Sequence, residues 1–184
     1  KECRKKSIDH LMKVIQASAL LKINLVTTFI GRNKNLNITD NLELAGNVWK
    51  PILEYAESLN VKIAIENCPM LFTEDEWPGG KNIAVSPAIW RELFKRLPSE
   101  YLGLNFDPSH FIWQEMDYIR PLYEFKDKIF HVHYKDIRVD KEARNEVGVL
   151  ATPLSYMVPC IPGHGDVNWA RYISASVSVQ KSSA

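Results

Sequence analysis

Helix-like and strand-like segments alternate along this chain, and that alternation constrains the fold more than any other feature. Apolar residues recur at helical spacing in some segments, and short apolar runs bounded by glycine or polar residues read as strands in others. The expected strands are residues 23–31, 61–67, 101–107 and 128–136, and the expected helices are 5–20, 39–59, 86–97 and, in part, 117–128. Thr39 or Asp40 is expected to cap the second helix, Pro51 to kink or split it, and Ser86 with Pro87 to begin the third. Residues 139–165 are expected to form a long connection. Strands alternating with helices predict a parallel sheet and an α/β fold.

The last three of these strands share a two-faced design, because alternate side chains of a strand point to the same side. The bulky apolar faces comprise Val61, Ile63 and Ile65; Leu102, Leu104 and Phe106; and Phe130, Val132 and Tyr134. The opposite faces carry small or polar residues and end in Glu66, Asp107 and His133. A doubly wound sheet would be apolar on both faces, whereas a barrel turns one face inward and places its site at the carboxyl ends of the strands. The pattern therefore predicts a barrel rim that carries these three residues.

Two carboxylates and a neutral imidazole are good ligands for a divalent metal such as Mn, Mg, Zn or Co. Each residue alone has an ordinary alternative. Glu66 can be a solvated or paired carboxylate, Asp107 can cap a turn fixed by the following proline, and His133 can be a hydrogen-bonded core residue. Their coincidence at equivalent strand ends favours a functional cluster. His131 lies one step deeper in its strand, which favours a supporting role, although a core or ligand role stays open.

Composition excludes several classes of protein. The chain has 184 residues, is 46% hydrophobic and carries a net charge of +1, which suits one globular domain without a nucleic-acid-binding tail. No apolar run reaches the length of a membrane span, and no signal-peptide pattern opens the chain. The three cysteines, Cys3, Cys68 and Cys160, are far apart and odd in number. They indicate a reducing compartment, and a cytoplasmic location is expected.

Four motifs carry a resemblance to a known family. In chain order they read "IAIENCPM", "NFDPSH", "HVHYKDIR" and "PGHGDVNW". Together they resemble the sugar phosphate isomerase/epimerase family of the xylose-isomerase-like TIM barrels, over residues 5 to about 173. The resemblance implies a (β/α)8 TIM barrel, here incomplete and covering about strands four to seven. It also implies that a further glutamate ligand belongs on strand eight.

The two ends of the chain differ from an ordinary complete domain. The first residue is Lys1 rather than methionine, and residues 174–184 are rich in serine and offer little to pack. We therefore expect a partial barrel over residues 1–173, a non-matching tail over 174–184, and a natural protein that is longer or ends unusually.

The resemblance also assigns roles to residues. It maps metal ligands onto Glu66, Asp107 and His133, and substrate contacts onto His110 and Arg138. For His110 the alternative is a solvent-facing turn histidine, and for Arg138 it is a surface salt bridge.

Other polar residues in the motifs receive weaker assignments. His164, and Lys81 in the expected rim loop 77–82, are further candidates for substrate contact. Asp166 is expected to cap a helix. Lys135 and Asp136 are given no chemistry. Of the tryptophans Trp77, Trp90, Trp113 and Trp169, we expect Trp90 and Trp169 in the core.

These assignments predict a divalent-metal-dependent isomerase or epimerase acting on a sugar, sugar phosphate or polyol through a metal-stabilised enediolate. Glu66 would bind the metal and act as the general base. We expect a small carbohydrate as the partner, with no nucleic acid or membrane, and self-association into a homo-oligomer is left open.

Three alternatives remain. A dehydratase of the inositol-catabolism type can use the same ligands. A phosphodiesterase like the AP endonucleases shares the spacing of Asp107 and His110, but the chain is not basic and lacks the Asp-x-His pair expected after "HYKD". Lastly, the chain can be an inactive fragment of a barrel, with unpaired strand edges.

Overall fold

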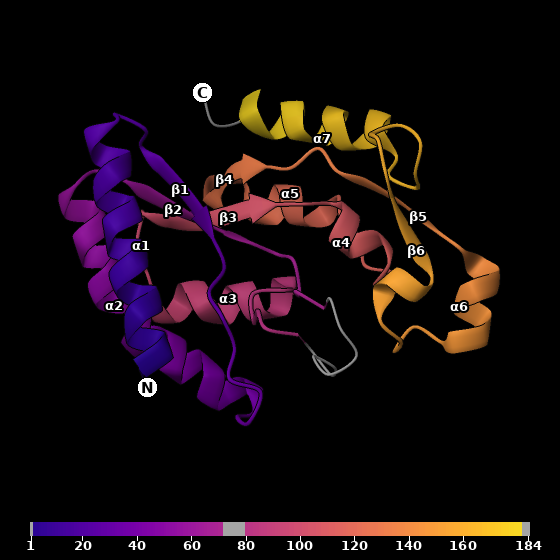
Figure 1. The fold of residues 1–184 in the computed structure, drawn as a ribbon. Coiled ribbons are helices and arrows are strands. Elements are labelled where there is room, and N and C mark those ends of the chain that lie inside the picture. Colours follow the sequence, from indigo (N-terminus) through magenta and orange to yellow (C-terminus); the bar gives the residue numbers. More distant parts are fainter. Residues whose placement is uncertain (1, 72–79, 182–184) are drawn as a thin grey trace.

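The computed structural model describes residues 2–71 and 80–181 and contains one parallel sheet with helices packed against it (Figure 1). The part that forms the sheet has the elements α1 (Glu2–Leu20), β1 (Leu25–Thr28), α2 (Ile38–Ser58), β2 (Lys62–Glu66), α3 (Pro87–Arg96), β3 (Leu102–Phe106), α4 (Ser109–Ile112), α5 (Arg120–Glu124), η2 (Lys126–Lys128) and β4 (Ile129–Val132). The rest of the chain has β5 (Asp136–Val139), α6 (Lys141–Val147), η3 (Pro153–Ser155), β6 (Met157–Cys160) and α7 (Trp169–Lys181). Within residues 2–71 and 80–181, no helix is long and apolar enough to cross a membrane.

The sheet has the strand order β1-β2-β3-β4, and all three pairings are parallel. The predicted α/β class is therefore confirmed. Because the chain order equals the spatial order, each crossover moves one strand along the sheet, as in a barrel rather than a doubly wound sheet. β1 and β4 are the outer strands, so the described part of the sheet is open at both edges, as expected for an incomplete α/β barrel.

The apolar face of the sheet forms the main core with the helices. Ile63, Ile65, Leu102, Leu104 and Phe106 are all at most 1% exposed. They pack with buried residues of α2, α3 and α7, which include Trp49, Ile52, Trp90, Leu93 and Tyr172. Trp90 is a core residue as predicted, and its Nε1 donates to the carbonyl of Ala84 at 2.8 Å. Trp169 also packs against this core, whereas Trp77 lies outside the described residues.

The helix boundaries agree with the predictions in part. Ser86 is the N-cap residue of α3, with Pro87 in its first turn as expected. The cap of α2 is Asn37, whose side chain accepts from the backbone N–H of Asp40, so the prediction of Thr39 or Asp40 as the cap is wrong. Pro51 lies within α2, which runs without interruption through that position.

The segment after β4 departs most from expectation. The strand predicted over 128–136 ends at Val132, and Asp136 instead opens β5, which pairs with β6 in a separate antiparallel sheet. The connection predicted over 139–165 contains α6, η3 and β6. Figure 1 shows the β5–β6 hairpin and α6 beyond the end of the main sheet. The serine-rich tail is helical as far as Lys181, and Ala175 and Val179 are buried in the core, so the expectation that it packs little is wrong.

A bulge in β4 changes which side chains face the barrel interior. Leu104 pairs with Ile129 but Asn105 pairs with His131, so Phe130 is an extra residue. A Cβ atom on Gly103 would lie 2.5 Å from the Phe130 ring, which shows that this ring covers the small-residue face of β3. The ammonium group of Lys62 lies 4.5 Å from the same ring centre. The prediction that Phe130 faces the helices is therefore wrong, whereas Val132 packs against the core as predicted.

Candidate metal and substrate site

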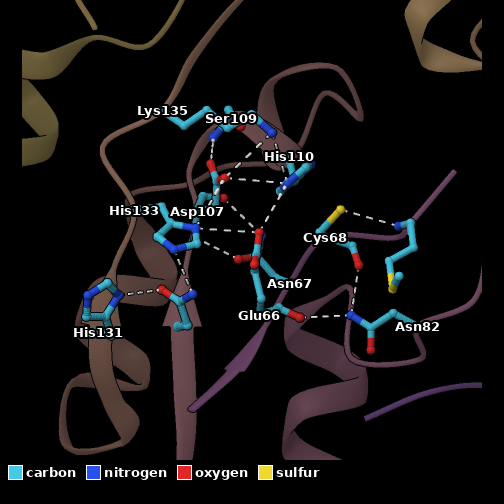
Figure 2. A network of polar contacts seen from close by, with 12 residues as sticks. Glu66, Asn67, Cys68, Asn82, Asp107, Ser109, His110, His131, His133 and Lys135 are labelled. Atoms are coloured by element: carbon cyan, nitrogen blue, oxygen red, sulfur yellow. Dashed lines mark hydrogen bonds and ion pairs between the residues drawn. The ribbon is translucent and has the colours of Figure 1, made fainter. Parts of the chain in front are cut away.

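Three strand ends bring Glu66, Asp107 and His133 together at the carboxyl edge of the sheet. Glu66 ends β2, and the other two residues follow β3 and β4 at the same level. His133 Nδ1 lies 3.5 Å from Glu66 Oε1 and 3.9 Å from Asp107 Oδ2. One ligand atom from each of the three residues lies within 4.8 Å of the other two. Figure 2 shows the side chains pointing toward one another, so the predicted ligands do form one cluster.

Asp107 is held rigidly by its backbone and by one carboxylate oxygen. Asn67 binds the Asp107 main chain from both sides: its Oδ1 accepts from the N–H at 2.7 Å and its Nδ2 donates to the carbonyl at 2.9 Å. Asp107 Oδ1 accepts from the N–H of Ser109 at 2.9 Å. Asp107 Oδ2 is buried and has no hydrogen-bond partner among the described residues. Burying a carboxylate oxygen without a hydrogen-bond donor destabilises the folded protein unless a cation or a ligand binds to that oxygen.

His110 lies beside both carboxylates, with Nε2 3.4 Å from Asp107 Oδ2 and 3.6 Å from Glu66 Oε1. Burial lowers the pKa of His110, but its contacts with Cys68 and Glu66 and the charge of Asp107 outweigh burial and raise that pKa to about 9. Burial likewise raises the pKa of Glu66, but His110, His133 and Lys135 together bring it below its ordinary value. In the metal-free protein His110 is therefore protonated at neutral pH beside an ionised Glu66.

Lys135 reaches this cluster, although it was given no chemistry on the basis of the sequence. Its Nζ lies 3.9 Å from Asp107 Oδ2 and 3.5 Å from His110 Nε2. It does not pair with the neighbouring Asp136. The signal available in the sequence was its position two residues after His133, which places both side chains on one side of an extended segment.

Cys68 is a second residue that the sequence analysis did not assign. Its side chain is 7% exposed, and its Sγ accepts from the N–H of Met70 at 3.4 Å. Together with Glu66 and His110 it forms a second group of ligand atoms within 4.8 Å of one another. Asn82 holds this turn because its Nδ2 donates to the carbonyls of Glu66 and Cys68, each at 2.8 Å.

A cavity of about 290 Å³ opens beside these residues. Glu66, Cys68, His110 and Lys135 give it a polar side. The other side is apolar and comes partly from the hairpin region, with Trp113, Leu154 and Met157 among its lining residues. A small polar molecule that entered this cavity would meet the Glu66 carboxylate and the side chains of His110 and Lys135 at one end.

Arg138 and His164 lie on the part of the chain that follows the sheet. Arg138 is exposed on β5, where it pairs with Val158 of β6. His164 is exposed in the turn before α7, and its backbone N–H donates to the carbonyl of Ile161 at 3.0 Å. Their contacts with a substrate stay predictions.

Asp136 organises the turn that carries His164. It is fully buried, and its Oδ2 accepts from the N–H groups of Gly163 and Gly165 at 2.9 and 3.0 Å and from Trp169 Nε1 at 2.8 Å. A Cβ atom on Gly165 would lie 2.3 Å from Asp136 Oδ1, which explains why the turn needs glycine there.

The same turn corrects one predicted helix cap. Asp166 was expected to cap the last helix, but its Oδ2 accepts from Val139 N–H instead. Asn168 Oδ1 accepts from the N–H of Arg171 at the start of α7, so Asn168 makes the capping contact.

The residues present fit a divalent metal. Oxygen and imidazole ligands converge, Asp107 Oδ2 accepts no hydrogen bond within residues 2–71 and 80–181, and the ligand atoms are close enough to share one ion. Glu66, Asp107 and His133 would hold it.

Comparisons with solved structures show the same fold in several proteins. The IolI protein with a bound zinc atom has a TM-score of 0.73 and 17% identity, with 97% of this chain and 58% of that chain covered. A D-tagatose 3-epimerase-like protein has a TM-score of 0.69 and 17% identity over 96% and 60% of the two chains. The probable 3-DHS dehydratase AsbF from Bacillus anthracis has a TM-score of 0.71 and 19% identity over 95% and 61%.

The sequence comparisons agree with the fold. The uncharacterized protein YfiH of Bacillus subtilis (strain 168) is 34% identical over 106 residues, which are 56% of this chain and 30% of YfiH. The chain thus spans less than two thirds of each of these relatives. The family described as the xylose isomerase-like TIM barrel matches residues 1–175, nearly the whole chain. The chain therefore belongs to the xylose isomerase-like TIM barrel family.

Proposed function

We propose that this chain carries the metal-binding half of an active site that isomerises or epimerises a sugar, a sugar phosphate or a related polyol. The observation that carries the proposal is the buried Oδ2 of Asp107, which faces ligand atoms of Glu66 and His133. This oxygen forms ion pairs with His110 and Lys135 but accepts no hydrogen bond from the residues that the structure describes. A divalent metal held by Glu66, Asp107 and His133 would supply Lewis-acid stabilisation of the negative charge that develops on the substrate.

The protein residues would then divide the remaining work. Glu66 removes a proton from the substrate carbon and returns it, because its lowered pKa keeps the carboxylate ionised at neutral pH. His110 and Lys135 offer positive charge to substrate oxygens from the polar side of the cavity. Arg138 is proposed as a further contact to substrate oxygens. The apolar wall of the cavity, which includes Trp113, would limit access of water to the reacting carbon.

The test measures metal binding and proton abstraction separately. Metal-free protein is titrated calorimetrically with Mn²⁺, Co²⁺ and Zn²⁺. The loaded protein is then incubated in D2O with ketohexoses, ketose phosphates and cyclitols, and NMR follows the entry of deuterium at carbon. We expect deuterium exchange that Glu66→Gln slows by at least about 100-fold.

Glu100→Gln is the matched control, because the Glu100 side chain is 92% exposed and belongs to a surface ion pair. Normal exchange in Glu66→Gln would remove Glu66 from the role of base. Metal binding without exchange in any of these substrates would contradict the proposed activity of this chain.

A dehydratase is the second candidate, and His110 is the observation that favours it. A histidine with a pKa of about 9 is a ready proton donor for a departing hydroxyl group at neutral pH. The same reaction mixtures distinguish the two activities. An epimerase changes the mass of the substrate only by the deuterium that it incorporates at carbon, whereas a dehydratase also removes one water molecule, and mass spectrometry detects this loss.

A further inference from the structure

The side chain of Asn105 lies between the two histidines of the "HVH" sequence. His131 Nδ1 lies 2.9 Å from Asn105 Oδ1, and His133 Nε2 lies 3.1 Å from Asn105 Nδ2. Asn105 is fully buried, whereas His131 is exposed. Figure 2 shows both contacts as dashed lines that start at the labelled histidines. One amide group thus touches one nitrogen of each imidazole ring.

The amide fixes which ring nitrogens carry hydrogen. An amide oxygen only accepts hydrogen bonds and an amide nitrogen only donates them. In the observed orientation His131 Nδ1 must therefore donate, and His133 Nε2 must accept. A neutral imidazole has one N–H, so neutral His133 carries its hydrogen on Nδ1. That is the atom 3.5 Å from Glu66 Oε1 and 3.9 Å from Asp107 Oδ2.

A metal ion needs the opposite arrangement. His133 can bind a metal through Nδ1 only when its hydrogen is on Nε2. This Nε2–H then needs an acceptor, and the atom available is Asn105 Oδ1 after the amide has turned over. The turned amide presents its NH2 group to His131 Nδ1, which must then accept, so the hydrogen of His131 moves to Nε2.

We propose that Asn105 is a positioning residue that couples the tautomers of His131 and His133, so that both rings and the amide switch together when a divalent cation binds. The proposal rests on the metal site of the proposed function. Each ring loses one hydrogen and gains one, so the number of protons on the pair is unchanged. The exposure of His131 suits this role, because its ring can exchange hydrogen with solvent while Asn105 stays buried.

Long-range ¹H–¹⁵N NMR spectra of ¹⁵N-labelled protein report the tautomer of each histidine directly. They are recorded at pH 8 without metal and with saturating Zn²⁺, and His131→Gln and His133→Gln assign the signals. We expect both rings as the Nδ1–H form without metal and both as the Nε2–H form with Zn²⁺. His10 and His164 are internal controls and should keep their signals. A His131 tautomer that stays unchanged while His133 binds zinc would overturn the coupling.

Asn105→Asp tests the coupling even if no metal binds. A carboxylate accepts from both rings, so metal-free His133 should change to the Nε2–H form, which is ready for a ligand. Zn²⁺ should then bind about tenfold or more tightly than to the wild type, whereas Asn105→Leu should weaken binding by about 10- to 100-fold. An unchanged His133 tautomer in Asn105→Asp would overturn the proposal. Absence of zinc binding in the wild type would count against the proposed function alone.

Discussion

At the scale of single residues, His110 ties the stability of the metal-free protein to pH. Its pKa is about 9 in the folded protein against an ordinary value of 6.5. The raised pKa stabilises the fold fully below about pH 6.5, and this contribution is lost as pH rises through 9. It amounts to about 3 kcal/mol. We expect the free energy of unfolding to fall by about that much between pH 6.5 and 9.5, measured by urea denaturation in EDTA.

His110→Gln is the comparison for this prediction. The variant lacks the titrating ring, so its stability should change much less over the same pH range. Parallel pH profiles for the variant and the wild type would show that another group is responsible.

Asp136 should be the most sensitive polar residue outside the cluster. Besides the three donors to its Oδ2, its Oδ1 accepts from the N–H groups of Ile137 and Val167 at 2.9 and 3.1 Å. Asn at this position would offer one acceptor oxygen and turn an NH2 group toward other donors. We expect Asp136→Asn to lower the free energy of unfolding by about 3 kcal/mol. Urea denaturation measures this, with exposed Asp9→Asn as the control; equal effects of both changes would contradict it.

The sequence predicted that Glu66, Asp107 and His133 lie together because they end strands of the same design, but it did not predict that Lys135 and Cys68 join them. Cys68 enters the site because of the course of the chain after β2, which has no periodic signal, whereas Lys135 lies two residues after His133 in the segment between β4 and β5. Asn105 belongs to the small or polar face that was predicted for its strand, but no role was predicted for it. Its role depends on two rings from another strand, and that contact depends on strand pairing rather than on local sequence.

At the scale of elements, the bulge in β4 sets the register of both histidines. The bulge takes up Phe130 as an unpaired residue between Ile129 and His131, which pairs with Asn105. Deleting Phe130 should therefore leave a regular strand with the same pairing. We expect this deletion to retain Zn²⁺ binding within about tenfold of the wild type, measured by calorimetry, with some loss of stability. Deleting Val132 instead should move His133 to the opposite face and abolish binding.

Phe130→Ala separates packing from register in that experiment. It removes the ring that covers Gly103 and keeps the bulge, so its loss of stability reports packing alone. If both deletions lost zinc to the same extent while their thermal melts remained cooperative, the register explanation would be wrong.

The helices and strands were predictable where they depend on the local sequence alone. All four strands of the sheet were expected from short apolar runs, and their boundaries differ by a few residues. The hairpin was missed because β5 continues the alternation that ends β4, and its partner β6 lies about 20 residues farther along the chain. Alternation therefore indicated an extended chain through Asp136 without showing which sheet each part joins.

At the scale of the whole molecule, a cleft with a mainly apolar lining lies open to solvent, and basic residues such as Arg4 and Lys6 also line it. It has a volume of about 860 Å³ and lies among α1, β1 and α2. Val26, Leu44 and Ile52 are among its lining residues. β1 borders this cleft and is also an outer strand of the sheet. An open strand edge beside an apolar surface favours pairing between copies of a chain.

We therefore expect the 184-residue chain to self-associate as its concentration rises from the micromolar toward the millimolar range, measured by sedimentation velocity. Thr27 is exposed at the centre of β1, so Thr27→Lys should weaken this association by placing a charge on the edge. Ser174→Lys, on the exposed side of α7, adds the same charge elsewhere and should leave association unchanged. A wild-type chain that stays monomeric and melts cooperatively throughout this range would show that the open edge is stable in solution without a partner.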